Sequence, residues 1–409
     1  MEKNKLLEKE NRFHDVISTS QKKPWYLLLG VWLGFIIVVG TMAAGGSLST
    51  MVNFKDLFIL TLLANLILGG VAGIFGYIGA KSGRSFASFV NLIFPGTSSK
   101  VVSFYVPLIL VFWFSVLSSI LGQYLVGFFG FSDVWIMPIS IVLCFVLSIT
   151  SYFGITALGY LSIVAVPFIM GLIGYSVMNF VLPTFTMTSQ LGNFTMVNTV
   201  LGIIVSTWIM GATINILDIT RYAKTPMIGG LIAFFGIVLG NSFNILIGAW
   251  AALVGGTSDP AQLLIGLGLP FFGFLLVILN IWTTNDNNMY SSSVGMANVL
   301  SISRKKSVLF LSFFAVLFVV FGVSGINNIM QAILVMGSTA PALGAVVLSG
   351  YLLMNKFENF KFNSLFGWVA WIIASGVGIY FEGLVGIVVA FVLSLAIHYS
   401  LSSYFVEVV

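Results

Sequence analysis

The stretch Asn280-Ile281-Trp282-Thr283-Thr284-Asn285-Asp286-Asn287-Asn288 interrupts an otherwise apolar block of the chain. Consecutive polar residues such as 283–288 are costly to place in lipid unless they have a use. On a helix, Asn280, Thr283 and Thr284 lie at i, i+3 and i+4, so their oxygens share one face. The alternative is that the run only caps a helix near the membrane surface. We therefore expect a membrane-spanning helix that carries a polar site.

The rest of the chain has the composition of a membrane protein. Of its 409 residues, 59% are hydrophobic and 7% are charged, whereas a soluble surface needs about a quarter of its positions charged. The apolar residues form blocks of roughly 20 residues, enough to cross a hydrocarbon core of about 30 Å. The alternating segments of a membrane barrel are absent, so the spans are predicted to be helices. The twelve predicted spans begin near Pro24, Phe54, Val101, Asp133, Gly154, Asn193, Pro226, Gln262, Ser307, Ile326, Asn363 and Gly383.

The charged residues between the blocks predict an orientation. Acidic residues such as Asp133 and Asp259 fall in the odd-numbered connections, with Lys55 the one basic residue on that side. The other basic residues fall in the N-terminal arm and the even-numbered connections: Lys3, Lys5, Lys9, Arg12, Lys22, Lys23, Lys81, Arg84, Lys100, Arg221, Lys224, Arg304, Lys305, Lys306, Lys356 and Lys361. Positive charge stays in the cytoplasm, so we expect a multi-pass protein of the cytoplasmic (inner) membrane with both termini cytoplasmic.

Several further expectations follow from charge and composition. The first span is expected to act as the insertion signal, without a cleavable signal peptide. The net charge of +5 reflects topology rather than nucleic-acid binding. The lipid bilayer is the expected partner, and no obligate protein partner is indicated. The single Cys144 lies in an apolar span and is expected to be a packing residue.

We predict one membrane domain with a short arm. Residues 1–23 form the cytoplasmic arm, 24–352 a ten-helix transporter core and 353–409 two additional helices. The stretches 40–47 and 206–215 are rich in glycine, small and polar residues and occupy the first and sixth spans, which correspond if the core is two inverted five-helix repeats. This placement predicts that helices 1 and 6 are broken at the midplane. The alternative is that the glycines only allow helices to pack closely.

The polar face of the eighth span offers ligands for a hard cation. Sodium requires several neutral or anionic oxygens, and Asn280, Thr283 and Thr284 supply an amide oxygen and two hydroxyls. Backbone carbonyls freed by a break in the first helix would supply the rest. Asn285 lies on the neighbouring face, and its amide has the donors and acceptor that match the edge of a heterocyclic base.

Other candidate residues have both structural and functional interpretations. Asp218 and Arg221 are spaced for a structural or gating ion pair, and Asp286 is a candidate for a proton or ion role. His398 is interpreted as a satisfied or interfacial histidine. Trp113 and Trp208 offer flat faces for a planar substrate, although most aromatic residues in apolar spans face lipid or pack. The chain has no phosphate-binding Gly-Lys-Ser/Thr loop, metal-binding cluster or nucleophile–base pair, so we do not expect an enzyme.

These residues also carry a family resemblance. The chain resembles nucleobase–cation symporter family 1, and within it the bacterial cytosine permeases, over most of its first 300 residues. The motifs that carry the resemblance are Ala44-Gly45-Gly46-Ser47-Leu48, Asp56-Leu57-Phe58, Gly76-Tyr77-Ile78-Gly79-Ala80-Lys81-Ser82-Gly83, Gly154-Ile155-Thr156-Ala157-Leu158, Leu239-Gly240-Asn241-Ser242 and Leu279-Asn280-Ile281-Trp282-Thr283-Thr284-Asn285-Asp286-Asn287. The resemblance implies an all-α, LeuT-like architecture of two inverted five-helix repeats plus two helices.

The resemblance also implies a site. Sodium would be held by carbonyls of Gly34 and Val38 together with the side chains of Asn280, Thr283 and Thr284. The base would be held by Asn285 and stacked on Trp113.

This sequence departs from the permease pattern in two places. The permeases have a glutamine where Leu110 stands, and leucine cannot hydrogen-bond a base. Their second stacking aromatic corresponds to Ile209, or to Trp208 with a shift of one residue. Despite these departures, the resemblance and the polar face of the eighth span predict sodium-coupled uptake of cytosine or a related pyrimidine by alternating access. The alternative is a proton-coupled or uncoupled transporter of another nucleobase-like heterocycle, with Asp286 titrating.

Overall fold

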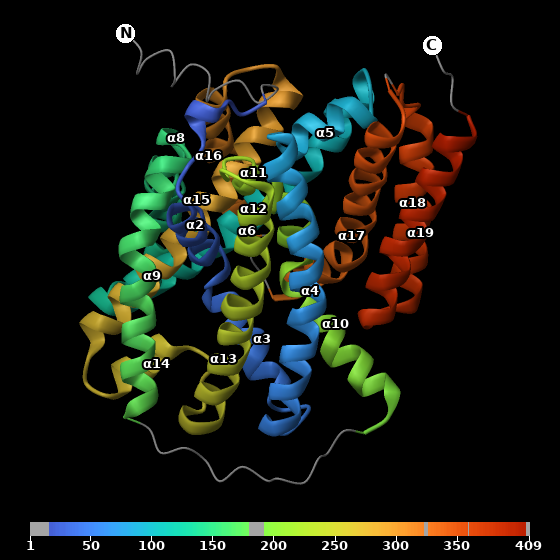
Figure 1. The fold of residues 1–409 in the computed structure, drawn as a ribbon. Coiled ribbons are helices and arrows are strands. Elements are labelled where there is room, and N and C mark those ends of the chain that lie inside the picture. Colours follow the sequence, from blue (N-terminus) through green and yellow to red (C-terminus); the bar gives the residue numbers. More distant parts are fainter. Residues whose placement is uncertain (1–15, 180–191, 323–325, 359, 406–409) are drawn as a thin grey trace.

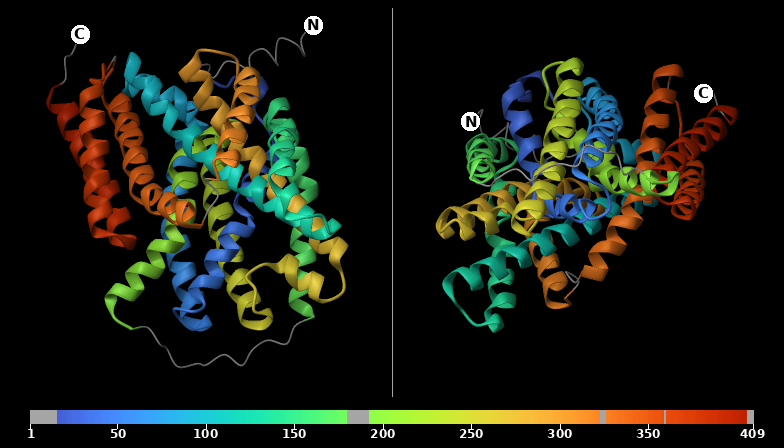
Figure 2. Two further views of the ribbon diagram at one scale, coloured as in Figure 1. Left: turned by 180° about the vertical axis from the view of Figure 1, so that it is seen from behind. Right: turned by 90° about the horizontal axis from the view of Figure 1, so that it is seen from below.

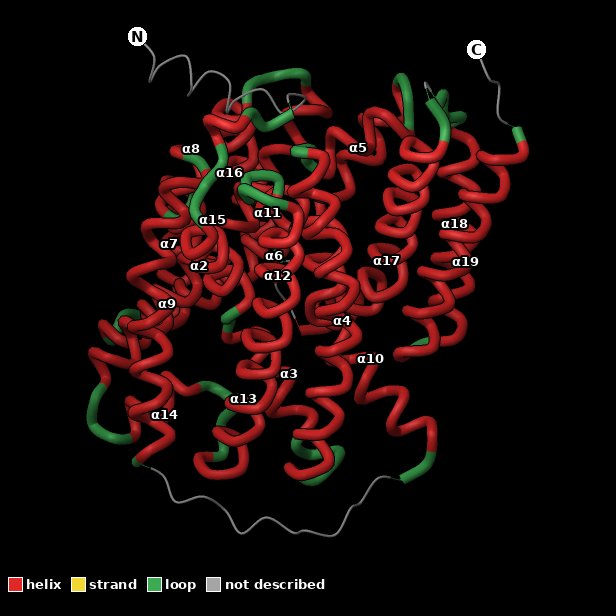
Figure 3. Tube along the Cα trace, in the orientation of Figure 1, coloured by secondary structure: helices red, strands yellow, loops and turns green. Residues whose placement is uncertain are grey.

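The computed structural model describes residues 16–179, 192–322, 326–358 and 360–405, and nearly all of that chain is helical (Figures 1 and 3). Spans one to six contain α2 (Trp25–Ile36), α3 (Val39–Leu48), α4 (Phe54–Ser82), α6 (Thr97–Phe129), α7 (Ile136–Val146), α8 (Ile149–Phe153), α9 (Ile155–Met178), α10 (Phe194–Met210), the π-helical η3 (Gly211–Asn215) and α11 (Ile216–Thr220). The later spans contain α12 (Pro226–Phe235), the π-helical η4 (Gly236–Asn241), α13 (Ser242–Gly255), α15 (Pro270–Leu300), α16 (Arg304–Val320), α17 (Ile326–Lys356), α18 (Ser364–Phe381) and α19 (Gly383–Tyr404). Short connecting elements are η1 (Thr19–Gln21), α5 (Phe86–Ile93), η2 (Asp133–Trp135) and α14 (Pro260–Gly266).

The prediction of an all-α, multi-span membrane protein is confirmed. In the described part of the chain, nine helices are long and apolar enough to cross a membrane, or ten if the bent pair α2 and α3 is one span. The two other predicted spans are α15, which contains the polar run, and α16, which has 17 residues. Each of the twelve predicted spans therefore has a helical counterpart.

The first span is broken, as predicted, but the break lies at the β-branched residues Ile37 and Val38 and not at the glycines that follow them. Ile37 has ψ 96° and Val38 is fully extended, with φ −142° and ψ 139°. The axes of α2 and α3 differ by 54°. Gly45 lies within α3, where a Cβ would overlap the backbone of Ile245 on α13. The glycines thus serve close packing, and the break lies just before them.

The sixth span differs from the predicted break. It stays helical from Phe194 to Thr220 and changes to π-helical winding over Gly211–Asn215. The Thr213 hydroxyl donates to the Ile209 carbonyl at 2.7 Å, so the wide turn keeps its carbonyl oxygens satisfied. A widened turn, rather than an interruption, therefore marks this span at the level of the break in the first.

Spans that lie five apart in the sequence pack against one another. The second span, α4, contacts α12 of the seventh; the third, α6, contacts α15, the eighth; and α7 of the fourth contacts α16, the ninth. This pairing is the one expected of two five-span repeats. The last two spans, α18 and α19, pack on α17 and α10 at one side of the bundle (Figures 1 and 2). The start of α2 and the end of α19 lie at the same end of the molecule (Figure 1).

The contact between α3 and α13 gives a first test. A Cβ at Gly248 would overlap the carbonyl of Met42, so we expect Gly248→Ala to destabilise the protein by about 1–3 kcal/mol through overpacking. The measurement is the thermal unfolding midpoint of the purified protein in detergent. Gly70→Ala on α4 is the matched control, because a Cβ there meets nothing within 4 Å. Equal midpoints for the two variants would contradict this packing.

Candidate functional site

The break in the first span leaves four backbone carbonyls without helical partners. The Ile37 N–H closes the last turn of α2 on the Leu33 carbonyl, so the carbonyls of residues 34–37 are the orphan acceptors of a helix end. In the interior of a membrane protein such groups cost several kcal/mol each unless they are satisfied. The side chains that reach them come from the seventh and eighth spans.

Two asparagines hold the break. The Asn280 amide donates to the Ile37 carbonyl at 2.9 Å and accepts from the Val39 N–H at 3.0 Å. It therefore ties the last carbonyl before the break to the first amide of α3. Asn244 on α13 donates to the Ile36 carbonyl at 2.6 Å. Both asparagines are fully buried, so these bonds are shielded from water.

Thr284 faces the remaining two carbonyls. Its hydroxyl oxygen lies 3.4 Å from the Gly34 oxygen and 3.3 Å from the Phe35 oxygen, longer than the usual O–H···O distance of about 2.7–2.8 Å. Neighbouring oxygens around one hard cation, each about 2.3–2.6 Å from it, stand roughly 3.3–3.7 Å apart. The two distances from the Thr284 oxygen also fall in this range.

Thr283 and Ser162 pack against Gly34. The Thr283 hydroxyl donates back to the Leu279 and Asn280 carbonyls, at 2.9 and 3.1 Å, which leaves its lone pairs free to accept. Ser162 on α9 is fully buried, and its hydroxyl has no hydrogen-bond partner. A Cβ at Gly34 would lie 2.6 Å from that hydroxyl and 3.3 Å from the Thr283 Cβ, so all three residues meet at one point. The sequence alone did not indicate Ser162 or Asn244.

Val38, which the resemblance implies as a sodium ligand, is the N-cap residue of α3. Its carbonyl accepts from the N–H groups of Thr41 at 3.1 Å and Met42 at 3.3 Å, as the first turn of α3. The free carbonyls lie on the other side of the break, at Gly34 to Ile37. Gly34, Thr283 and Thr284 therefore lie close together, whereas Val38 directly precedes α3 and Asn280 braces the backbone.

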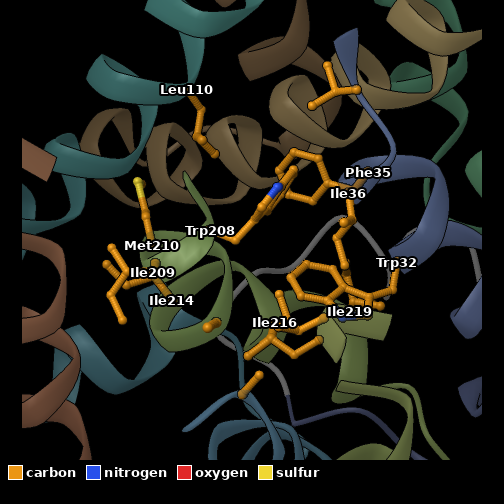
Figure 4. Close-up of a cluster of buried hydrophobic side chains, with 14 of the residues drawn as sticks. Trp32, Phe35, Ile36, Leu110, Trp208, Ile209, Met210, Ile214, Ile216 and Ile219 are labelled. Carbon is orange, nitrogen blue, oxygen red and sulfur yellow. The ribbon is translucent and has the colours of Figure 1, made fainter. Parts of the chain in front are cut away.

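The aromatic residues of the first and sixth spans form a cluster beside the break (Figure 4). Trp208 makes edge contacts with Phe35 and Trp32, at centroid distances of 5.0 and 6.1 Å. Its Nε1 donates to the Thr41 hydroxyl at 3.2 Å. Leu110 lies in the same cluster, on α6 across from Trp208 (Figure 4).

Ile209 points away from this cluster. It lines an apolar crevice that also contains Val205, Leu384 and Ile387 from α10 and α19. Of the two positions left open by the sequence, Trp208 is therefore the one that faces the break.

Asn285 and Trp113 are held by neighbouring helices in this structure. The Asn285 amide donates to the Phe114 carbonyl at 3.0 Å and to the Ser118 hydroxyl at 3.2 Å, both on α6. The half-buried Trp113 donates through Nε1 to the Met336 sulfur at 3.2 Å. A substrate that uses Asn285 has to exchange these bonds for its own.

Asp218 and Arg221 do not form the direct ion pair that their spacing predicted. Asp218 accepts from the Phe86 N–H at 3.1 Å. Arg221 donates to the hydroxyls of Tyr222 and Tyr290, each at 3.1 Å. The Arg221 Nε also donates to the Asp218 backbone carbonyl at 3.3 Å, so the two residues are joined through the backbone, while the Asp218 carboxyl binds α5 and the guanidinium binds Tyr290 of α15. His398 bonds Ser349 at 2.9 Å between α17 and α19, and Cys144 is a buried free thiol.

Comparison with known proteins assigns the family. The model of a family described as permeases for cytosine/purines, uracil, thiamine and allantoin matches residues 16–367. The chain belongs to this family of permeases. The cytosine permeases of Escherichia coli strains K12 and O6:H1 are each 29% identical to it over 396 residues, which covers 91% of the chain and 89% of each relative. The family is one of membrane transporters, not of enzymes.

Solved structures agree on the fold. Mhp1, a nucleobase–cation–symport-1 family transporter solved in a closed conformation with bromovinylhydantoin bound, matches with a TM-score of 0.83 at 16% identity, over 96% of the chain and 95% of Mhp1. A Na⁺-coupled sialic acid symporter, solved in a substrate-bound outward-open state, matches with a TM-score of 0.68 at 12% identity, over 98% and 94% of the two chains. The LeuT-like architecture is thereby confirmed, and the family model with the cytosine permeases supports the resemblance found in the sequence.

The brace at the break gives a second test. We expect Asn280→Ala to destabilise the sodium-free protein by about 1–3 kcal/mol, because it strands the Ile37 carbonyl and the Val39 N–H. The measurement is thermal unfolding in sodium-free buffer. Asn355→Ala is the control, since Asn355 is exposed and bonds only within its own helix. If Asn280→Ala unfolded at the wild-type temperature, Asn280 would not brace the break.

Proposed function

We propose that the chain imports a nucleobase, cytosine or a related pyrimidine, together with sodium across the cytoplasmic membrane. The observation that carries the proposal is the position of the Thr284 hydroxyl, 3.4 and 3.3 Å from the free carbonyls of Gly34 and Phe35. Oxygens at this spacing suit a hard monovalent cation better than they suit each other. The family supports a nucleobase-like substrate, and its cytosine permeases support cytosine in particular.

The proposed sodium site joins three spans. Sodium would bind the Gly34 carbonyl and the hydroxyls of Thr283 and Thr284, with Ser162 as a further ligand from α9. Asn280 would act as a brace that keeps the carbonyls in place. This arrangement needs no charged ligand, which suits an ion that must be released at the end of each cycle.

Coupling would follow from the shared helix. Thr284 and Asn285 are adjacent on α15, so an ion that fixes α15 against α2 also fixes the residue proposed to hold the base. The base would lie against Trp208 or Trp113 and bond to Asn285 in exchange for its contacts with α6. By linkage, sodium then tightens base binding by the same factor as the base tightens sodium binding.

Alternating access would use the broken first span. Its two halves meet at an angle of 54°, and α2 packs on α9 while α3 packs on α13. Each half can therefore move with a different set of neighbours around the ion site. We place both termini in the cytoplasm because of the positive charge in the arm and the even-numbered connections.

Uptake of radiolabelled cytosine into proteoliposomes tests the function. We expect uptake with an inward sodium gradient and none with choline in its place. Thr284→Ala is expected to raise the sodium concentration for half-maximal uptake by about tenfold or more, since it removes one ligand worth roughly 1.5–3 kcal/mol. Thr199→Ala, at a half-buried threonine of α10 whose hydroxyl bonds within its own helix, is the control. Uptake that ignored sodium and followed pH would instead favour the proton-coupled alternative.

Leu110 gives a test of base specificity. It is 4% exposed and lies across from Trp208. We expect Leu110→Gln to strengthen cytosine binding by about three- to tenfold, because an amide there can add one hydrogen bond of roughly 0.5–1.5 kcal/mol. Competition with radiolabelled cytosine measures the change, and Leu108→Gln on the exposed side of α6 is the control. Weaker binding in Leu110→Gln would indicate that the natural substrate needs an apolar contact at this position.

A further inference from the structure

The spans of the core pack in two groups. In the first group, α4 of span two contacts α10, α11 and α12 of spans six and seven, and α3 of span one contacts α13. In the second group, α6 of span three contacts α7 and α15 of spans four and eight, and both of these contact α16 of span nine. The end of the molecule where α2 begins, which we place in the cytoplasm, contains α11 of the first group and α8 of the second (Figure 1). A contact between the groups at this end closes the way from the site to the cytoplasm.

Three buried side chains make such a contact. Arg221 and Tyr222 directly follow α11, and Tyr290 lies on α15. The Arg221 Nη2 donates to the hydroxyl oxygens of Tyr222 and Tyr290, each at 3.1 Å, and the two hydroxyls lie 3.0 Å apart. Each of the three residues is at most 2% exposed, so the contact excludes water. The bonds that Arg221 and Tyr222 make with Tyr290 cross from the first group to the second.

Arg221 and Tyr222 are anchored within the first group by the segment that precedes α2. Lys22 donates through Nζ to the Arg221 carbonyl at 2.8 Å and to the carbonyl of Ala80 on α4 at 3.3 Å. The Lys23 N–H donates to the Tyr222 carbonyl at 2.8 Å. These bonds fix the backbone of both residues on the ends of the second and sixth spans.

Tyr290 is anchored within the second group by Arg304 at the start of α16. The guanidinium carbon of Arg304 lies 5.3 Å from the centroid of the Tyr290 ring. Its terminal nitrogens donate to the carbonyls of Ser151 and Tyr152 in α8. Each side of the contact is therefore held by its own group, and the bonds to the Tyr290 hydroxyl are the ones that part if the groups separate.

We propose that Arg221, Tyr222 and Tyr290 form a latch that closes the cytoplasmic side of the transport path and opens once in each cycle. Tyr290 follows Thr284 on α15 and lies about 9 Å further along the helix. The latch therefore lies between the proposed ion site and the cytoplasmic end of the molecule. Opening it breaks only the two bonds to Tyr290, because Arg221 keeps its bonds to the Tyr222 hydroxyl and the Asp218 carbonyl.

The chemistry of the latch suits a contact that opens repeatedly. The phenol hydroxyl of Tyr290 is neutral, so its separation from Arg221 leaves no second unpaired charge inside the membrane domain. Separating an arginine from a carboxylate would leave two unpaired charges there, at a much higher cost. The inference rests on the proposed function in that the latch serves alternating access, but it does not depend on which ion or base is carried.

Access of a thiol reagent to α15 tests the latch. Ser291 follows Tyr290, is 2% exposed, and its hydroxyl bonds to the carboxyl of Asp218 in the first group. Ser291→Cys in a Cys144→Ser background therefore places the only thiol of the chain between the two groups. Inside-out membrane vesicles are treated with a membrane-impermeant maleimide in choline buffer, without sodium or base. We expect Tyr290→Phe to speed labelling by about tenfold, because it removes both bonds that cross between the groups.

Three controls accompany this variant. Tyr222→Phe leaves the bond from Arg221 to Tyr290 in place and is expected to speed labelling by only about two- to threefold. Tyr160→Phe, at an exposed tyrosine of α9, is the matched control and is expected to leave the rate unchanged. The native Cys144 is buried in α7 and reports general loosening of the fold. In a chain that keeps Cys144 as its only thiol, Tyr290→Phe is expected to leave labelling as slow as in the wild type.

The outcomes separate the latch from the proposed function. Equal labelling of the Ser291→Cys protein with and without Tyr290→Phe would overturn the latch, and so would an equal rise in the labelling of Cys144. Size-exclusion profiles identify a variant that fails to fold, and if Tyr290→Phe fails, an unchanged rate in Tyr222→Phe overturns the latch by itself. Because neither sodium nor base is present, a working latch without sodium-driven uptake would overturn only the proposed function. Sodium-driven uptake with an unchanged labelling rate would overturn only the latch.

Discussion

Four backbone carbonyls at the end of α2 impose the main constraint on this structure. These carbonyls lie inside the membrane domain, where water does not supply hydrogen bonds to the backbone. The next turn of helix would supply them, but α2 ends at Ile36. Polar side chains from two other spans hydrogen-bond to these carbonyls: Asn244 from α13, and Asn280 and Thr284 from α15. Much of the polar chemistry at the centre of the bundle follows from this one interruption.

As a consequence, the first, seventh and eighth spans are joined at the break by hydrogen bonds of unequal length. We call this contact the joint. Asn244 and Asn280 satisfy their carbonyls with short bonds, whereas Thr284 reaches two carbonyls at distances too long for strong hydrogen bonds. The Ile36 and Ile37 carbonyls thus accept strong hydrogen bonds, whereas the Gly34 and Phe35 carbonyls accept only weak ones. An ion that binds at the weak part would complete the joint, which is how a transported ion can control the angle of a broken helix.

The polar residues of α15 lie on more than one face of the helix, which is more than one ion site would need. Thr283 and Thr284 face the break, Asn285 faces α6, and Asp286 faces α8, so successive residues serve three different neighbours. A helix that is polar on several faces can be stable in a membrane only where protein surrounds it, and α15 is buried along most of its length. Its central position places it in contact with the first, third and fifth spans at once.

The sequence by itself determined the helical class, the number and order of the spans, and the importance of the run from Asn280 to Asn288. These properties depend on local composition and on the length of apolar blocks, because the bilayer sets a fixed thickness and forbids unsatisfied backbone. Helical spacing also predicted a common face for Asn280, Thr283 and Thr284, and the resemblance added Gly34 to the proposed sodium site. The break of the first span was predicted as well, although the glycines suggested a position slightly too late.

Only the tertiary structure decided which groups meet. It assigned Asn280 to the backbone rather than to an open ligand position, gave the Val38 carbonyl to α3, and directed Trp208 rather than Ile209 toward the break. It gave the Asp218 carboxyl and the Arg221 guanidinium different hydrogen-bond partners and brought Ser162 and Asn244 to the centre. Most of these outcomes depend on contacts between residues far apart in the sequence, such as Asn280 with Ile37 and Asn244 with Ile36. A hydrogen-bonding side chain takes whichever partner the packing of the helices brings within reach.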